Sequence, residues 1–263
     1  MNPPESAGGP APGSIDPPSP LAAETGAGAR PVRRPPWVAA LAAGVVAAGL
    51  SWGAGEVANG LFAPQLLVDP MKGPTAGAAS NEDIRRGRVL DATLTYGVQG
   101  AVLGLLLGLA GASVGGTGRS GAIGGAAGLA AGGLLGAGGA SILFSIYLEN
   151  VDPNANDLLF PLAIHAGVWS LVGLAGGLAL GLGAGGGRSR IARVAVGGLV
   201  GGAIGAAVYE VGGAILFPIA KTSQPIAEEA MARLLAHSVT SVLAALVAAM
   251  SLAEPKPRRG ASG

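Results

Sequence analysis

Five side chains in otherwise apolar segments carry the groups that could do chemistry in this chain. They are two carboxylic acids, two imidazoles and a phenol, namely Glu56, Glu210, His165, His237 and Tyr96. Each stands about seven or eight residues inside one end of its segment, so all five lie roughly 10 to 12 Å below the same membrane face. Two carboxylates and two imidazoles in one layer can relay protons, or bind a divalent cation through oxygen and nitrogen ligands.

Three interpretations of this layer are open. It is a transport site, because ionisable groups inside a bilayer are costly and often mark an ion path. Or it only holds helices together, with Glu56 and Glu210 turned to interfacial water or paired with a histidine or a loop arginine. A metal site is the third, but no segment has His-x-x-x-His or Glu-x-x-His spacing, so we predict no metal. Asn59, Gln99 and Ser51 are secondary polar contacts in either of the first two interpretations.

These residues lie in apolar segments that are each long enough to cross a bilayer. The clearest is Gly121–Tyr147, which has no charged residue and at about 1.5 Å per residue spans a hydrocarbon core of about 30 Å. The chain is 50% hydrophobic and 12% charged, with 48 glycines, a composition typical of polytopic helical membrane proteins. The sequence predicts an all-α transmembrane domain, 37–253, with six spans at about 37–62, 89–113, 121–147, 158–183, 194–217 and 229–252.

The ends of the chain are expected to lie outside this domain. Residues 1–36 are rich in Pro, Gly, Ala and Ser, which predicts a disordered tail, and 254–263 form a second tail. The charged and apolar regions come too late for a cleavable signal peptide, so we expect the first helix to be retained. Lys and Arg favour the side of both termini by ten (30, 33, 34, 119, 188, 190, 193, 256, 258, 259) to six (72, 85, 86, 88, 221, 233). This bias predicts cytoplasmic termini in an inner or plasma membrane.

Glycine recurs at every fourth position in four of the segments, which places a glycine stripe on one face of each helix. Such stripes let helix backbones approach closely in lipid, as in a glycine zipper. The stripe residues are Gly100, Gly104, Gly108, Gly124, Gly128, Gly132, Gly136, Gly173, Gly177, Gly181, Gly185, Gly197, Gly201 and Gly205. We expect them to close the cytoplasmic half of the domain against a wide channel. A stripe on an outer face would equally join two copies, so a homo-oligomer is also open.

The segments also resemble one another in pairs, which suggests an internal repeat. The first and fifth both end in a Glu followed by a Pro eight positions later, at Glu56 and Glu210. The fourth and sixth share the strings Leu162-Ala-Ile-His165 and Leu234-Leu-Ala-His237, and the second offers Leu94-Thr-Tyr96 at the matching place. The simplest account is three helical hairpins inserted in the same sense.

Several function classes are not expected. A net charge of +1 gives no argument for nucleic acid, and the absence of cysteine removes disulfides and thiolate sites. Gly118-Arg-Ser-Gly121 resembles the G-x-S-G string of rhomboid intramembrane proteases, which also have a six-helix core and a histidine partner. Ser120, however, falls in a cytoplasmic connection while both histidines are near the opposite face, so we predict no enzyme and no cofactor.

The sequence therefore predicts an integral membrane protein whose partner is the lipid bilayer. The favoured function is a small proton- or cation-linked transporter or permease, acting on an unspecified small molecule or ion through the polar layer. The alternative is a non-transporting membrane scaffold or assembly protein held together by its glycine stripes.

Overall fold

The computed structural model describes residues 35–59, 61, 62, 80–151 and 158–252, which all belong to one compact unit, Arg34–Gly263. Over these residues it is all-helical, without strands. The helices are α1 (Pro36–Ala58), α2 (Asn81–Val114), α3 (Gly118–Asn150), α4 (Leu159–Gly183), α5 (Arg188–Leu216) and α6 (Ala230–Met250). The prediction of 6 helices long and apolar enough to span a membrane is confirmed. The predicted tails lie outside the described residues, apart from Pro35 and Pro36.

The helix ends depart from the predicted spans where polar residues extend a helix beyond its apolar part. α2 begins at Asn81 rather than at Val89, because Ser80 caps it. The Ser80 hydroxyl accepts a hydrogen bond from the Asp83 backbone N–H at 3.1 Å, and the Asp83 carboxylate accepts one from the Ser80 N–H at 3.3 Å. Residues 81–88, ahead of the second predicted span, are thus the first part of α2. α5 also begins ahead of its expected start, at Arg188 and not at Val194, but no side chain caps it.

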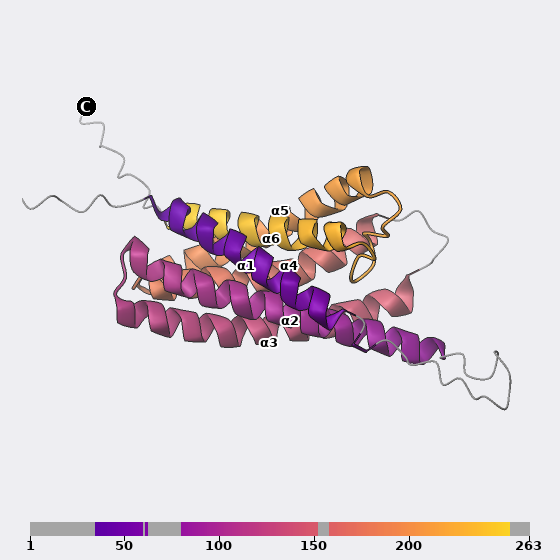
Figure 1. Cartoon of the computed structure of the whole chain (residues 1–263). Coiled ribbons are helices and arrows are strands. Elements are labelled where there is room, and N and C mark those ends of the chain that lie inside the picture. The colour runs from indigo at the N-terminus through magenta and orange to yellow at the C-terminus, as the bar shows by residue number, and fades with distance from the viewer. Residues whose placement is uncertain (1–34, 60, 63–79, 152–157, 253–263) are drawn as a thin grey trace, which may run out of the picture. The chain divides into compact units, whose positions relative to one another are not determined.

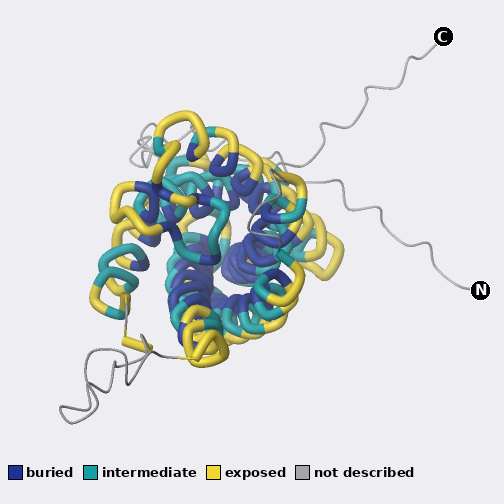
Figure 2. Tube along the Cα trace, turned by 90° about the vertical axis from the view of Figure 1, so that its right-hand side faces the viewer, coloured by how far each residue is buried: buried dark blue, intermediate teal, exposed yellow. Residues whose placement is uncertain are grey.

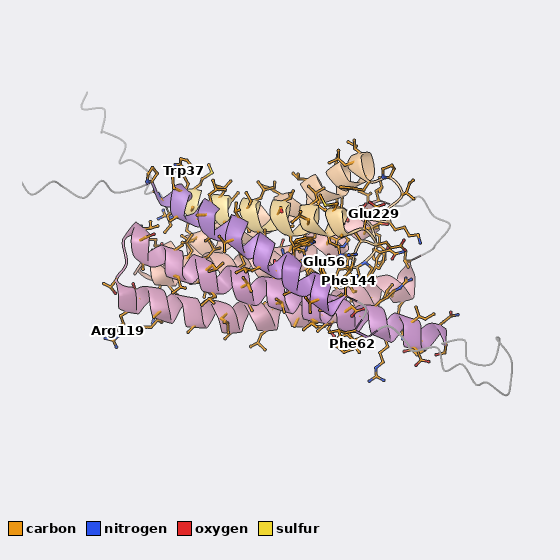
Figure 3. The ribbon with its side chains drawn as sticks, in the orientation of Figure 1. Trp37, Glu56, Phe62, Arg119, Phe144 and Glu229 are labelled. Carbon is orange, nitrogen blue, oxygen red and sulfur yellow. The ribbon has the colours of Figure 1, made fainter. Side chains whose placement is uncertain are left out.

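The helices form an antiparallel bundle in which α1 begins and α6 ends at the same end (Figure 1). Trp37 and Arg119 mark this end, which we call the tail end, whereas Glu56, Phe62 and Glu229 lie towards the other end, which we call the polar end (Figure 3). Seen end-on, buried residues face the interior of the bundle and exposed residues face outwards (Figure 2). The outward face of α5 is apolar, as lipid contact requires, with exposed Val196, Val200, Ile204, Val208, Val211 and Ile215.

Glycines allow α2 and α3 to touch backbone to backbone. A Cβ added at Gly100, Gly104 or Gly108 would come under 3.0 Å from backbone atoms of Gly132, Gly128 or Gly124, respectively. The same holds between Gly173 on α4 and Gly198 on α5. Only glycine therefore fits at these contacts without a shift of one helix.

The two ends of the bundle have different cores. Towards the tail end, α2, α4, α5, α6 and α1 meet in a dry cluster of small and aliphatic side chains, including the fully buried Leu103, Leu107 and Leu180. Towards the polar end the core is aromatic, with Tyr96, Phe144, Tyr147, Trp169 and Tyr209. The polar groups of the candidate site are built into and beside this aromatic core.

Candidate functional site

His165 of α4 and Glu210 of α5 form an almost completely buried acid–base pair. The imidazole Nδ1 contacts the carboxylate Oε1, and the side chains are only 2% and 6% exposed. Aromatic rings enclose the imidazole: Trp169 stacks on it at 5.3 Å between centroids, and Phe144 and Tyr209 present edges at 5.5 and 6.1 Å. Each group is of a type that can give or accept a proton. The surrounding aromatic rings separate the pair from other proton donors and acceptors.

Glu56 of α1 and Arg233 of α6 form the second charged pair of the site. The guanidinium donates two hydrogen bonds to the carboxylate, from Nε to Oε1 at 2.6 Å and from Nη2 to Oε2 at 2.7 Å. Its Nη1 donates to the backbone carbonyls of Ala227 and Glu228, both at 2.8 Å. Because all three guanidinium nitrogens are used, Arg233 ties α1, α6 and the chain before α6 together and neutralises Glu56.

The second histidine does not join the first. His237 of α6 is 5% exposed, and its Nδ1 lies 3.0 Å from the Ser51 hydroxyl of α1. One turn further, Gln99 of α2 donates to Thr240 at 2.8 Å and to Ser241 at 3.3 Å. Arg233, His237 and Ser241 are spaced every fourth residue, so they share one face of α6. We call the residues on this face and opposite it the polar column: Ser51, Glu56, Thr95, Gln99, Arg233, His237, Thr240 and Ser241.

Tyr96 of α2 lies between the buried pair and the polar column. Its ring stacks on Phe144 of the aromatic cage with centroids 5.4 Å apart, and its hydroxyl donates to the Pro225 carbonyl at 2.8 Å. Tyr209 similarly donates to the Thr222 carbonyl at 3.4 Å. These bonds hold the chain between α5 and α6, residues 217–229, against the polar end of the bundle.

Two cavities flank this segment. The larger, of about 300 Å³, is a polar vestibule that opens at the polar end, and its lining includes Asn59, Arg88, Asp91, Gln224, Glu228 and Arg233. The smaller, of about 20 Å³, lies against the polar column and is lined by Thr95, Tyr96, Gln99, Tyr209, Arg233 and His237, among others. Pro225, Ile226, Ala227 and Arg233 line both. They therefore form the partition between the vestibule and this inner cavity.

The predicted site residues thus fall into two groups. His165 and Glu210 pair directly between α4 and α5, Glu56 and His237 belong to the polar column between α1 and α6, and Tyr96 stands between the groups.

Sequence reasoning missed the central role of Arg233, which was used only in the count of Lys and Arg on one membrane side. It also missed Thr95 of α2 and Thr240 and Ser241 of α6, although the spacing of Arg233, His237 and Ser241 on one helix face was a usable signal.

The contacts of the described residues support neither a metal site nor a protease site. Across the described ranges, no three or more His, Asp or Glu side chains are grouped so that they could hold a metal ion. Ser120 lies at the start of α3, where its backbone N–H donates to Thr117 and its hydroxyl donates to the Gly183 carbonyl at 2.8 Å. Its hydroxyl therefore serves the contact between the α3 start and the α4 end.

The geometry alone guides a functional assignment. Comparison of the chain with protein-family models, with curated proteins and with solved structures finds no match.

Proposed function

We propose that this chain is a small proton-linked transporter of the membrane, in which the His165–Glu210 pair carries the coupled proton. The observation that supports this most is the burial of an acid–base pair, at 2% and 6% exposure, between two helices long enough to span a bilayer. A buried pair adds little to stability compared with apolar residues of similar size, so stability alone gives no reason to place it there. Proton relays in membranes use such carboxylate and imidazole groups.

In this proposal the two charged pairs have different roles. His165 and Glu210 share one proton and exchange it when the aromatic cage around them opens. Glu56 and Arg233 neutralise each other and fix α1 to α6, so that they control access from the polar end. Tyr96 couples the two, because its ring contacts the cage and its hydroxyl holds the 217–229 segment. A linked cation in place of the proton would need Glu210 as its ligand.

The three-hairpin repeat and the glycine zipper are part of the same proposal. In the repeat, each glutamate would stand on the first helix of a hairpin and face the second helix of the preceding one. The contacts of Glu210 with α4 and of Glu56 with α6 fit this rule if the hairpins close into a ring. The close approach of α2 to α3 and of α4 to α5 at glycines is the packing expected of a zipper.

Flux measurements on the purified protein in liposomes test this function. Under an imposed proton gradient, we expect Glu210→Gln to lower proton flux at least tenfold, because the amide keeps the shape of the carboxylate but cannot exchange a proton. The matched control is Glu149→Gln, which changes an exposed acid that pairs with Arg85 at 2.7 Å at the surface. Equal flux in wild type and Glu210→Gln would refute proton transport through the pair.

A scaffold without transport is the second candidate, and the dry cluster at the tail end favours it. Leu103, Leu107 and Leu180 are fully buried there, so a transporter must rearrange this core to let a solute through. A scaffold predicts no flux in either protein and unchanged partner binding in Glu210→Gln. In neither candidate do we propose an enzyme, since the Ser120 hydroxyl is bound in a helix contact.

A further inference from the structure

The polar column and the two cavities together have the form of an inlet that enters the bundle from one end only. The vestibule is roomy enough for several water molecules, and the inner cavity of about 20 Å³ has room for about one. A water in the inner cavity would have polar partners on several sides, because hydroxyl, amide, guanidinium and imidazole groups line it. Polar lining of this kind favours a hydrated cavity over an empty one.

Beyond the inner cavity the column ends. Gln99 donates to both Thr240 and Ser241 there. The next residues on the same helix faces, Leu103 and Ala245, belong to the dry cluster and are fully buried. Water that enters from the polar end therefore has hydrogen-bonding partners down to Gln99 and Ser241 and none in the aliphatic cluster after that.

The partition between the cavities is one continuous piece of chain with Arg233 beside it, and Ile226 and Ala227 pack it against neighbouring apolar side chains. Pro225, Ile226 and Ala227 form it with Arg233, and Tyr96 and Arg233 hold its carbonyls. Lys221, which is in the left-handed region at φ 46, pairs with Glu228 at 2.8 Å and so closes the segment on itself. Loss of the Arg233 bonds would remove the hydrogen bonds that Arg233 makes to this piece, and would leave the Tyr96 bond and the packing of Ile226 and Ala227.

We propose that the vestibule and the inner cavity form a gated water inlet that reaches His237, with Arg233 and the Pro225–Ala227 turn as its gate. The role of this inlet rests on the proposed transport function. Its existence does not, because access of a reagent to the inlet can be measured without any flux. The inlet admits water and small hydrophilic solutes from the polar end and stops at Gln99 and Ser241.

Cysteine accessibility tests the inlet directly, because the chain contains no cysteine. Three neighbouring residues of α2 lie at about the same height in the bundle, but each has a different environment. Thr95 lines the inner cavity, Ala92 is fully buried in the aromatic core, and Thr93 lines an apolar groove on the outside of the bundle. Thr95→Cys, Ala92→Cys and Thr93→Cys are reacted singly with a membrane-impermeant, positively charged methanethiosulfonate, added from the polar end of the reconstituted protein.

The reagent is larger than the inner cavity of about 20 Å³, so it reaches position 95 only when the gate opens. Through these openings we expect Thr95→Cys to react at least tenfold faster than the other two variants. In a Glu56→Gln, Arg233→Gln background, which removes both charges of the gate, its rate should rise a further tenfold while Ala92→Cys stays slow. Equal rates at the three positions would overturn the inlet. The gate would be refuted if the Glu56→Gln, Arg233→Gln background left the labelling rate of Thr95→Cys unchanged. It would also be refuted if that background raised the rate of Ala92→Cys by the same factor. Fast, gated labelling without proton flux would keep the inlet and reject the transport function instead.

Discussion

At the scale of single residues, the charges buried in the bundle are partnered, and Arg233 has the fullest set of partners. It makes two bonds to Glu56 and two to backbone carbonyls, while its side chain is 10% exposed and that of Glu56 is 28% exposed. Removing one member of such a pair leaves the other charge without its counter-ion, which costs more than removing both.

We therefore predict that Arg233→Gln lowers the free energy of unfolding by about 2–3 kcal/mol, because Glu56 loses its counter-ion in a partly buried place. The double variant Arg233→Gln, Glu56→Gln should recover about 1 kcal/mol of this, since no lone charge remains. The measurement is an unfolding titration of wild type and both variants in mixed detergent micelles. A double variant less stable than Arg233→Gln alone would show that the charges are not what couples these residues.

At the scale of helices, the apolar pattern predicted the elements because a bilayer leaves a single segment no alternative to a helix. The ends were less accurate, since caps such as that of Ser80 let polar residues such as Asn81–Arg88 continue a helix beyond its apolar part. The glycine stripes marked residues that do lie at close helix contacts, such as Gly104 against Gly128. They did not specify which helices touch.

The contacts of the candidate site could be predicted only in part. The positions of Glu56, Glu210, His165 and His237 along their helices followed from their spacing to the helix ends, because the rise per residue is fixed. Their pairing did not, since it depends on which helices are neighbours and how each is turned about its axis. Arg233 was counted only among the charges of one membrane side, because it stands near the start of the sixth predicted span, yet its side chain pairs with Glu56 of α1.

Two glycines of α3 give a matched test of helix contact. A Cβ at Gly128 would come under 3.0 Å from the Gly104 backbone, whereas one at Gly138 would have nothing within 4 Å. We predict that Gly128→Ala lowers the free energy of unfolding by about 1–3 kcal/mol, because α2 and α3 must move apart. Gly138→Ala should leave it unchanged or raise it by up to about 1 kcal/mol, since alanine is the better helix former.

Unfolding in detergent micelles, followed by circular dichroism, measures both alanine variants. Equal effects of the two substitutions would mean that the α2–α3 contact tolerates a wider spacing than the structure indicates. Helicity at the start of each titration shows whether a variant folded, so a loss of contact is distinguished from a failure to insert.

At the scale of the whole molecule, the distribution of charge bears on orientation. Four arginines stand at the tail end, at the start of α3 and at the start of α5: Arg119, Arg188, Arg190 and Arg193. Of the charges counted at the other end, Arg233 is buried and paired with Glu56. Removing it from the count strengthens the excess at the tail end, which supports the proposal that this end faces the cytoplasm.

Labelling of single cysteines in intact cells tests this orientation, again because the native chain has none. Gly118 and Gly187 lie at the tail end, where an added Cβ meets nothing within 4 Å, and Ile219, at the polar end, is 84% exposed. We predict that an impermeant maleimide labels Ile219→Cys in intact cells but labels Gly118→Cys and Gly187→Cys only after the membrane is opened. The reverse pattern would place the vestibule on the cytoplasmic side, so that the inlet would draw its water from inside the cell. Labelling of all three in intact cells would mean that the helices do not cross the membrane as a bundle.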